Sequence, residues 1–249
     1  VVATACGFRT ATFAREIAEL LGQDDDAAEF AALADRLAAG FHDRYVDGGR
    51  VHSDCTTVYS LAIVFGLLAD DELRVAGDRL AELVRAAGHH VSTGFAGTPY
   101  ICDALTQTGH LDDAYGLLLE RSMPSWLYPV TMGATTVWER WDSMLPDGSI
   151  NPGHMTSFNH YAFGAVADWM HRTVGGLAPA EPGYATLLVA PRPGGGLTGA
   201  RTSLQTSYGL ASVDWRLDDG ELEVVVVVPP GRSAVVDIPG SPVDHLPEG

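Results

Sequence analysis

The sequence predicts an α+β, multidomain fold with paired helices over residues 1–178 and a small antiparallel β-sandwich over residues 179–249. The first observation is that apolar residues recur at helical spacing through residue 173, in segments separated by short turns rich in glycine and aspartate. The second is that helical spacing disappears after Gly175-Gly176, where prolines and glycines become frequent. Runs of helices followed by runs of strands are typical of two successive domains.

The helical segments follow one another closely enough to form pairs. Helix-starting and helix-ending signals place them at residues 10–21, 24–45, 57–68, 73–87, 98–108, 111–120, 136–141 and 157–173. Gly22 and Asp47-Gly48-Gly49 are examples of the breaks between them. Helices joined by short turns form αα-hairpins, so we expect an open or closed array of hairpins.

The C-terminal region shows short β-branched runs between turn signals. We expect strands at residues 185–189, 200–207, 209–216, 221–228 and 233–238. The uninterrupted valine run from Val224 to Val228 favours a strand that is buried on both faces. A small sandwich of two sheets is the simplest arrangement for these strands.

Composition limits the classes of partner. Hydrophobic residues make up 46% of the 249 residues, which is enough for a sizeable core. The formal net charge is −17, and every Lys+Arg position is arginine. Nucleic acid and anionic membrane surfaces both require a basic footprint, so we expect neither as a partner. A neutral ligand such as a sugar is compatible with this charge. No signal peptide or long apolar span is visible, and the compartment, cytoplasmic or secreted, stays open.

Cysteine and histidine usage predicts neither a disulfide framework nor a metal site. Cys6, Cys55 and Cys102 are few and odd in number, and we expect all three to be buried as small apolar residues. The histidines are scattered without metal-ligand spacing. No dinucleotide-binding or phosphate-binding glycine motif is present, so no cofactor is expected.

The segment GATTVWERWD, residues 133–142, is the strongest candidate for a functional site. It places Glu139 between Trp138 and Trp141, and residues 151–164 follow as a second dense segment that contains His160. Indoles stack on the apolar faces of pyranose rings, and carboxylates move protons at glycosidic bonds. A sugar-hydrolysing site and a structural role, with core indoles and a solvated glutamate, fit these residues about equally well.

GATTVWERWD and MTSFNHYAFGAV (residues 155–166) together closely resemble the catalytic region of bacterial α-L-rhamnosidases, glycoside hydrolase family 78. The stretches at residues 88–100 and 182–193, GHHVSTGFAGTPY and PGYATLLVAPRP, are similar to the same family. The resemblance therefore covers essentially the whole chain. It implies an (α/α)6 barrel followed by a C-terminal β-sandwich, and an inverting mechanism with two carboxylic acids.

The resemblance also implies roles for individual residues. Glu139 matches the general base of the family, and His160 matches a residue that contacts the sugar. Trp138 and Trp141 are candidates for lining or supporting the substrate site, without a firm family role. The substrate implied is a rhamnose-containing glycoside, from which terminal α-L-rhamnose is released.

The chain departs from the family in one respect. A six-hairpin barrel has twelve helices, whereas eight helical segments are predicted here. The general acid of the family lies in an acidic, tryptophan-containing motif upstream, and Asp47, Asp54 and Asp103 lack that context. We therefore expect a fragment without the general acid, with little activity alone. The open edge of such a barrel would expose apolar helix faces and favour self-association.

Two other functions remain open from the sequence. One is another (α/α)6 glycosidase, such as a glucoamylase-like or trehalase-like enzyme. The other is a non-catalytic module that binds sugar without hydrolysing it. Without the resemblance, His160 would be read as a core histidine near the start of a helix. Substrate profiling distinguishes the two enzymes, and binding without turnover would indicate the module.

Overall fold

A computed structural model describes residues 1–246 and divides the chain into two compact units, Val1–Gly164 and Ala165–Gly249. The first unit is helical and the second is rich in strands. The predicted order of helical hairpins and then strands is confirmed. The domain boundary between residues 178 and 179 stays a prediction. Within residues 1–246, no helix combines the length and the apolar character needed to cross a membrane.

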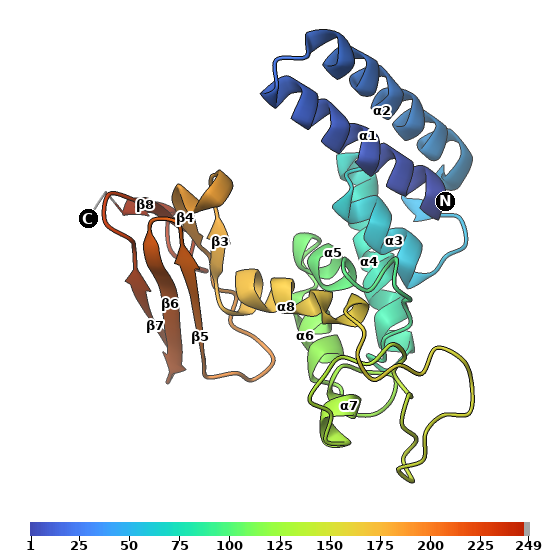
Figure 1. The fold of residues 1–249 in the computed structure, drawn as a ribbon, viewed down its shortest axis with the longest axis vertical. Helices are drawn as coiled ribbons and strands as arrows, with labels where there is room; N and C mark the ends of the chain where they lie inside the picture. Colours follow the sequence, from blue (N-terminus) through green and yellow to red (C-terminus); the bar gives the residue numbers. More distant parts are fainter. Residues whose placement is uncertain (247–249) are drawn as a thin grey trace. The chain divides into compact units, whose positions relative to one another are not determined.

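The helices of the first unit are joined by alternately short and long connections (Figure 1). The helices are α1 (Val2–Leu20), α2 (Asp24–Tyr45), α3 (Thr56–Val64), α4 (Asp70–Ala86), α5 (Ile101–Gln107), α6 (Leu111–Leu119) and α7 (Leu127–Thr131). The short connections are residues 21–23, 65–69 and 108–110, and the long ones are residues 46–55, 87–100 and the stretch 120–161, which includes the short helix α7. Antiparallel neighbours reverse direction at every turn, so the long connections share one end of the array.

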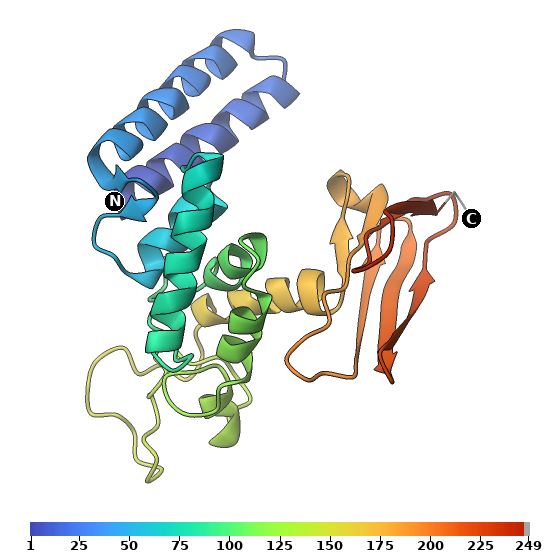
Figure 2. The ribbon, with the colours of Figure 1, turned by 180° about the vertical axis from the view of Figure 1, so that it is seen from behind.

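The hairpin of α1 and α2 shows how a short connection is made. Both helices lie side by side in Figures 1 and 2. Gly22 has φ +67°, a left-handed conformation that glycine adopts without steric cost. The amide of Gln23 then donates to the carbonyl of Ala18 at 2.9 Å, and that of Gly22 donates to Glu19 at 3.1 Å. This pair of bonds is a Schellman motif, which ends α1 and reverses the chain within three residues.

The core of the first unit is built around α3. Its residues 58–63 are all buried, including Tyr59 and Leu61, so both faces of this helix are covered. Amphipathic α4 packs on α3 and buries Leu80 and Val84, which lie one helical turn apart. Complete burial of such a side chain contributes roughly 1.5–3 kcal/mol to stability. The long connection that precedes α3 is thereby tied to a rigid element.

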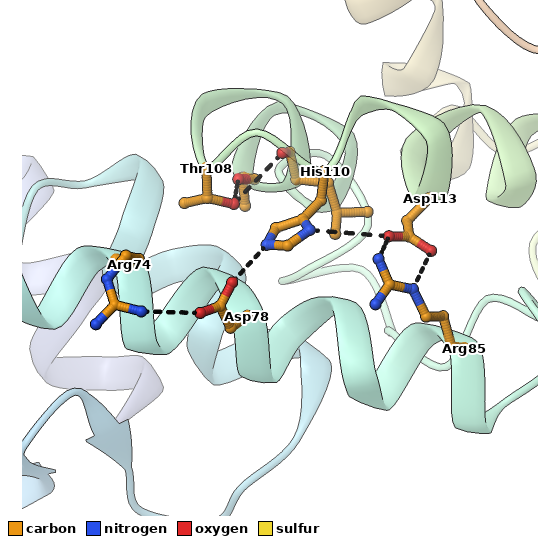
Figure 3. A network of polar contacts seen from close by, with 8 residues as sticks. Arg74, Asp78, Arg85, Thr108, His110 and Asp113 are labelled. Carbon is orange, nitrogen blue, oxygen red and sulfur yellow. Dashed lines mark hydrogen bonds and ion pairs between the residues drawn. The ribbon is translucent and has the colours of Figure 1, made fainter.

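A polar network joins α4 to α6 and to the turn before α6 (Figure 3). The carboxylate of Asp113 is buried, and Arg85 donates to it at 2.6 and 2.9 Å. His89 lies 3.0 Å from Asp113, and His110 lies 3.2 Å from Asp78. Burial raises the pKa of Asp113, but hydrogen bonds from Arg85 and His89 lower it more, so its pKa lies below the usual range. The ionised carboxylate therefore fixes the packing of these helices.

Several predicted elements differ in the structure. No helix forms at residues 136–141, which are bends, a turn and irregular backbone, and the prediction of a helix there was wrong. A short helix, α7, forms instead at residues 127–131, where a loop was expected. The last helical stretch begins at Ala162, not at residue 157, and runs through η1 (Ala162–Ala165), α8 (Val166–Trp169) and η2 (Met170–Val174).

The backbone contacts of residues 136–141 explain the missing helix. The amide of Glu139 donates to the carbonyl of Ser157 at 2.9 Å, and the amide of His160 donates to Val137 at 2.8 Å. These backbone amides and carbonyls are hydrogen-bonded between the segment around Glu139 and the segment around His160, so they cannot form the hydrogen bonds of a helix. A second wrong prediction concerns the cysteines, because Cys6 and Cys55 are exposed and only Cys102 is buried.

The second unit contains two sheets. Strands β3 (Leu177–Pro179), β4 (Thr186–Val189), β8 (Ser233–Val236) and β9 (Asp244–Leu246) form one, in the order β3-β4-β8-β9. Strands β5 (Gly199–Thr206), β6 (Gly209–Asp218) and β7 (Glu221–Val227) form the other, and the short helix η3 (Pro182–Tyr184) precedes β4. Neighbouring strands pair antiparallel except β4 and β8, which are parallel.

The core of this unit draws on both sheets. Leu177 and Leu187 of the first sheet are fully buried in one cluster with Val213 of the second. The valine run of β7 packs on this cluster with only one face, because Val225 on the other face is 55% exposed. The prediction of burial on both faces was wrong, because the three-stranded sheet that contains β7 has one face that is open to solvent.

Candidate active site

The segment around Glu139 lies alongside the segment around His160. The two backbone hydrogen bonds from Glu139 to Ser157 and from His160 to Val137 hold the segments together. The amide of Ser157 also donates to Oε2 of Glu139 at 3.2 Å. Glu139 and His160, two of the four residues that the sequence proposed for the site, therefore lie on two segments that pair antiparallel and are about twenty residues apart in sequence.

The carboxylate of Glu139 is half-buried and faces no cationic side chain in the described part of the chain. Its neighbour Arg140 is held by Asp142 instead, with contacts of 2.5 and 3.2 Å. A carboxylate with one amide contact and no ion pair retains lone pairs with which to accept a proton from water.

The imidazole of His160 is oriented by rings and by one backbone amide. It lies parallel to Phe95, with centroids 4.9 Å apart, and to the exposed ring of Tyr161, 5.2 Å away. Its Nδ1 accepts a hydrogen bond from the amide of Ala162 at 3.3 Å. In the neutral ring the proton then resides on Nε2, which is available to donate to a ligand oxygen.

Both tryptophans of the motif contact other aromatic rings. Trp138 is only 4% exposed and contacts Phe158 edge to face at 5.2 Å. Trp141 stacks on Phe163, with centroids 3.9 Å apart and planes 6° apart. Trp126 contacts Trp141 in a T-shaped arrangement and donates from Nε1 to the carbonyl of Phe163 at 2.9 Å. The indoles thus form the support behind the segment that carries Glu139.

A cavity of about 290 Å³ adjoins these indoles. Trp138 and Arg140 line it, whereas Glu139, which lies between them in sequence, does not. His160 is not part of its lining either. The structure therefore brings Glu139 and His160 together, and it places Trp138 and Trp141 around a separate apolar cavity.

Asp142 and Asn151, which the sequence analysis did not single out, hold the loop between the two segments. Asn151 donates from Nδ2 to Asp142 at 2.8 Å, and its backbone amide donates to Ser143 at 2.9 Å. With the bidentate contact from Arg140, Asp142 accepts three hydrogen bonds. In the sequence WERWD an arginine stands two residues before an aspartate, and this spacing could have indicated the contact between Arg140 and Asp142.

Side chains from other long connections reach the same region. Phe95 comes from residues 87–100, and it was also missed by the sequence analysis. The hydroxyls of Thr56 and Ser92 lie 2.9 Å apart, and the amide of Val91 donates to Pro124 at 2.9 Å. These contacts join residues 87–100 to the first residue of α3 and to the connection that begins at residue 120.

Asp54, one of the acidic residues weighed as proton donors, is bound by other side chains. Arg79 contacts Asp54 at 2.7 and 3.0 Å, and the hydroxyl of Tyr59 donates to it at 2.7 Å. Hydrogen bonds from Arg79 and then Tyr59 lower the pKa of Asp54 to about 2. A carboxyl group with that pKa is ionised at neutral pH and cannot supply a proton. Asp47 lies in the strand β1 (Val46–Asp47), which pairs with β2 (Arg50–Val51), and Asp103 lies in α5.

Residues 1–246 contain no group of three or more His, Cys, Asp and Glu side chains arranged to hold a metal ion. The side chains on the paired segments that can take part in acid–base or hydrogen-bonding chemistry include the Glu139 carboxylate and the His160 imidazole. Hydrolysis of a glycoside uses two carboxyl groups, one of which activates water while the other protonates the departing oxygen, so Glu139 could supply one of the two.

Comparison with protein families identifies the chain. The family model described as the bacterial alpha-L-rhamnosidase six-hairpin glycosidase domain matches residues 1–174. The chain belongs to the bacterial α-L-rhamnosidase family. The C-terminal domain of the same family matches residues 176–248. The resemblance drawn from the sequence is confirmed, and other (α/α)6 glycosidase families are no longer needed to explain the chain.

Named relatives agree with this rhamnosidase assignment. An alpha-L-rhamnosidase of Streptomyces avermitilis is 41% identical over 99% of this chain, and one of Formosa agariphila is 38% identical over 96%. These matches cover 24% and 26% of the two relatives. The chain thus spans about a quarter of the length of the curated rhamnosidases it matches.

Solved rhamnosidase structures have the same fold. Native α-L-rhamnosidase from Aspergillus terreus superposes with a TM-score of 0.94 at 38% identity, over 97% of this chain and 29% of that one. The Streptomyces avermitilis α-L-rhamnosidase complexed with L-rhamnose gives a TM-score of 0.93 at 37% identity, over 99% of this chain and 26% of that one. The predicted fold, part of a six-hairpin domain followed by a β-rich domain, is confirmed.

Proposed function

We propose that this chain carries the general-base half of an inverting glycoside hydrolase that releases terminal α-L-rhamnose from rhamnosides. The observation that carries the proposal is the position of Glu139, whose carboxylate has no cationic partner in residues 1–246 and lies on the segment paired with His160. The names of the relatives support rhamnose as the sugar released.

In the proposed mechanism Glu139 removes a proton from water as the water attacks the anomeric carbon. The Nε2–H of His160 donates to a sugar hydroxyl and holds the ring in place. An acid about 6.5–9.5 Å from Glu139 protonates the departing oxygen. Trp138 and Trp141 support the Glu139 segment from behind and do not touch the sugar.

The proton donor is proposed to lie in a part of the enzyme outside these 249 residues. Asp54 is held ionised by Arg79 and Tyr59, so it cannot take this role. The chain also spans only about a quarter of its relatives, which leaves room for the acid elsewhere. Loss of a general acid lowers rate by about 10²–10⁴, and loss of the substrate-positioning walls lowers it further.

Turnover measurements test the proposal. An intact enzyme that carries this chain should hydrolyse an aryl α-L-rhamnoside and should not hydrolyse the matching α-D-glucoside. Proton NMR at early times should show the β-anomer of rhamnose first, because the mechanism inverts the anomeric centre. The isolated 249-residue chain should show no measurable turnover. Parent-like rates from the isolated chain would contradict a missing acid, and rhamnose binding without turnover in the intact enzyme would favour a sugar-binding module.

We further propose that the isolated chain self-associates through α1. Phe13, Ile17, Leu20 and Leu21 are exposed large hydrophobic side chains at helical spacing, and Leu20 is 87% exposed. A contiguous apolar stripe of this kind favours contact with a second copy of the same surface.

Light scattering tests this self-association. Oligomers should form as the concentration of the isolated chain rises, and Leu20→Glu should shift the chain to monomer. Ala28→Glu, which adds the same charge at an exposed position of α2, is the matched control and should not change the assembly. A wild-type chain that stays monomeric at high concentration would rule the proposal out.

A further inference from the structure

Phe95 connects the candidate site to the aromatic support behind it. Its ring lies parallel to the imidazole of His160, at 4.9 Å and an interplanar angle of 12°. On another side it contacts Phe163 at 5.1 Å, and Phe163 is buried and stacked on Trp141. Phe95 is nevertheless 38% exposed, so burial alone does not account for its position.

The loop that carries Phe95 is held by its own hydrogen bonds. The carbonyl of Gly94 accepts from the amides of Gly97 at 3.1 Å and Thr98 at 3.0 Å, and from the hydroxyl of Thr98 at 2.8 Å. The hydroxyls of Thr93 and Thr98 are both buried and lie 2.8 Å apart. Hydrogen bonds from Gly97 and Thr98 to Gly94, and between Thr93 and Thr98, therefore close the turn that carries Phe95.

The same loop packs without space against the first turn of α3. A Cβ atom added at Gly97 would lie 2.7 Å from Oγ1 of Thr57 and 2.9 Å from Cγ2 of Thr93. Real side chains do not approach so closely, so the backbone of the loop is in direct contact with α3. Since α3 is the buried helix of the first unit, the ring of Phe95 has a rigid base.

The orientation of His160 depends on two separate contacts. The amide of Ala162 at Nδ1 determines which ring nitrogen carries the proton. The parallel contact with Phe95 limits rotation of the ring plane. Within residues 1–246 the Nε2 atom has no hydrogen-bond partner, so its direction is determined by the orientation of the ring. A directional donor loses its hydrogen bond when the ring plane tilts.

We propose that Phe95 is a positioning residue, which holds the imidazole of His160 in the plane that directs Nε2–H to a sugar hydroxyl. The inference rests on the proposed function, because the role of His160 in sugar binding comes from there. Phe95 acts through His160 and does not itself need to touch the sugar. A contact made in both the bound ground state and the transition state changes KM and leaves kcat nearly unchanged.

Kinetics of Phe95 variants in an intact enzyme that carries this chain provide the first test. Phe95→Leu should raise KM for an aryl α-L-rhamnoside about five- to tenfold and leave kcat within about twofold, since one neutral hydrogen bond is misdirected. Phe95→Tyr keeps the ring and should restore KM. Phe30→Leu, at a partly exposed phenylalanine of α2, is the matched control and should behave as wild type. An unchanged KM in Phe95→Leu would overturn the inference.

A double-mutant cycle separates positioning from a general loss of structure. His160→Ala removes the group on which Phe95 is proposed to act. Adding Phe95→Leu to His160→Ala should then change KM by less than about twofold, because the two substitutions share one effect. Effects that multiply independently would show that Phe95 acts without His160 and would overturn the inference.

NMR of the 249-residue chain tests the ring contact without reference to turnover. The imidazole protons of His160 should be shifted by the ring current of Phe95, and Phe95→Leu should remove that shift. An unaltered shift would refute the orienting contact even if the enzyme is a rhamnosidase. A second outcome is that the shift behaves as expected but the intact wild-type enzyme does not act on rhamnosides. The proposed function then fails, and so does the part of the inference that concerns the sugar. The contact between Phe95 and His160 would still be established.

Discussion

Glu139→Gln should lower kcat of an intact enzyme that carries this chain by about 10³-fold or more while L-rhamnose still binds within a few-fold. The amide has nearly the same shape as the carboxylate and can still accept from the amide of Ser157, so the pairing with the His160 segment is kept. It cannot accept a proton from water at neutral pH. Glu29→Gln, at an exposed position of α2, is the control and should be fully active.

A second variant tests the base role against a merely structural one. Glu139→Ala removes the carboxylate and leaves space beside the anomeric carbon. Azide is a nucleophile that needs no deprotonation, so it should restore turnover in this variant and yield rhamnosyl azide of inverted configuration. Azide should have little effect on Glu139→Gln, where the space is filled. Turnover near the wild-type level in either variant without azide would remove Glu139 from the base role.

Asp113→Asn should lower the free energy of unfolding of the helical unit by about 2–3 kcal/mol at pH 7. The carboxylate is buried and accepts two hydrogen bonds from Arg85 and one from His89. Hydrogen bonds to charged groups contribute roughly 1.5–3 kcal/mol, and an amide reproduces only part of this geometry. Asp112→Asn changes the exposed neighbouring aspartate and should alter stability by less than about 0.5 kcal/mol.

The effect of Asp113→Asn should depend on pH. The pKa of Asp113 in the folded protein lies below the ordinary aspartate value of 3.8, so its charge stabilises the fold fully above that pH. That contribution is lost as the pH falls through the lowered folded-state pKa. Urea unfolding should therefore show a large difference between wild type and variant at pH 7 and a shrinking one below pH 3.8. Equal unfolding free energies at pH 7 would contradict the role of this carboxylate.

Local sequence patterns predicted most of the helices and strands because their boundaries depend on nearby residues. Segments such as α2 and α6 begin and end within a residue of the predicted limits. The failure at residues 136–141 has a non-local cause. The amide of Glu139 is paired with Ser157, and that partner is supplied by the tertiary fold, so helical spacing alone could not reveal it.

The part of the candidate site that lies in local sequence motifs was predictable, and the part that depends on tertiary packing was not. Glu139 and His160 were both found because each lies in a motif typical of the family, and the structure places their segments together. Phe95 lies in a different connection, and nothing in its local sequence indicates that its ring faces His160. The tryptophans were visible as a pattern, but whether they face a ligand or the core depends on packing, and Trp138 is in the core.

The alternation of short and long connections has a consequence for how such enzymes diversify. The turns at residues 21–23 and 108–110 are too short to change length without disturbing the helices they join. The connections at residues 87–100 and 120–161 can gain or lose residues at the surface, since the helices are packed independently of their length. Insertions and deletions among related enzymes should therefore accumulate at the catalytic end. New leaving-group preferences can evolve there while the opposite end preserves the scaffold.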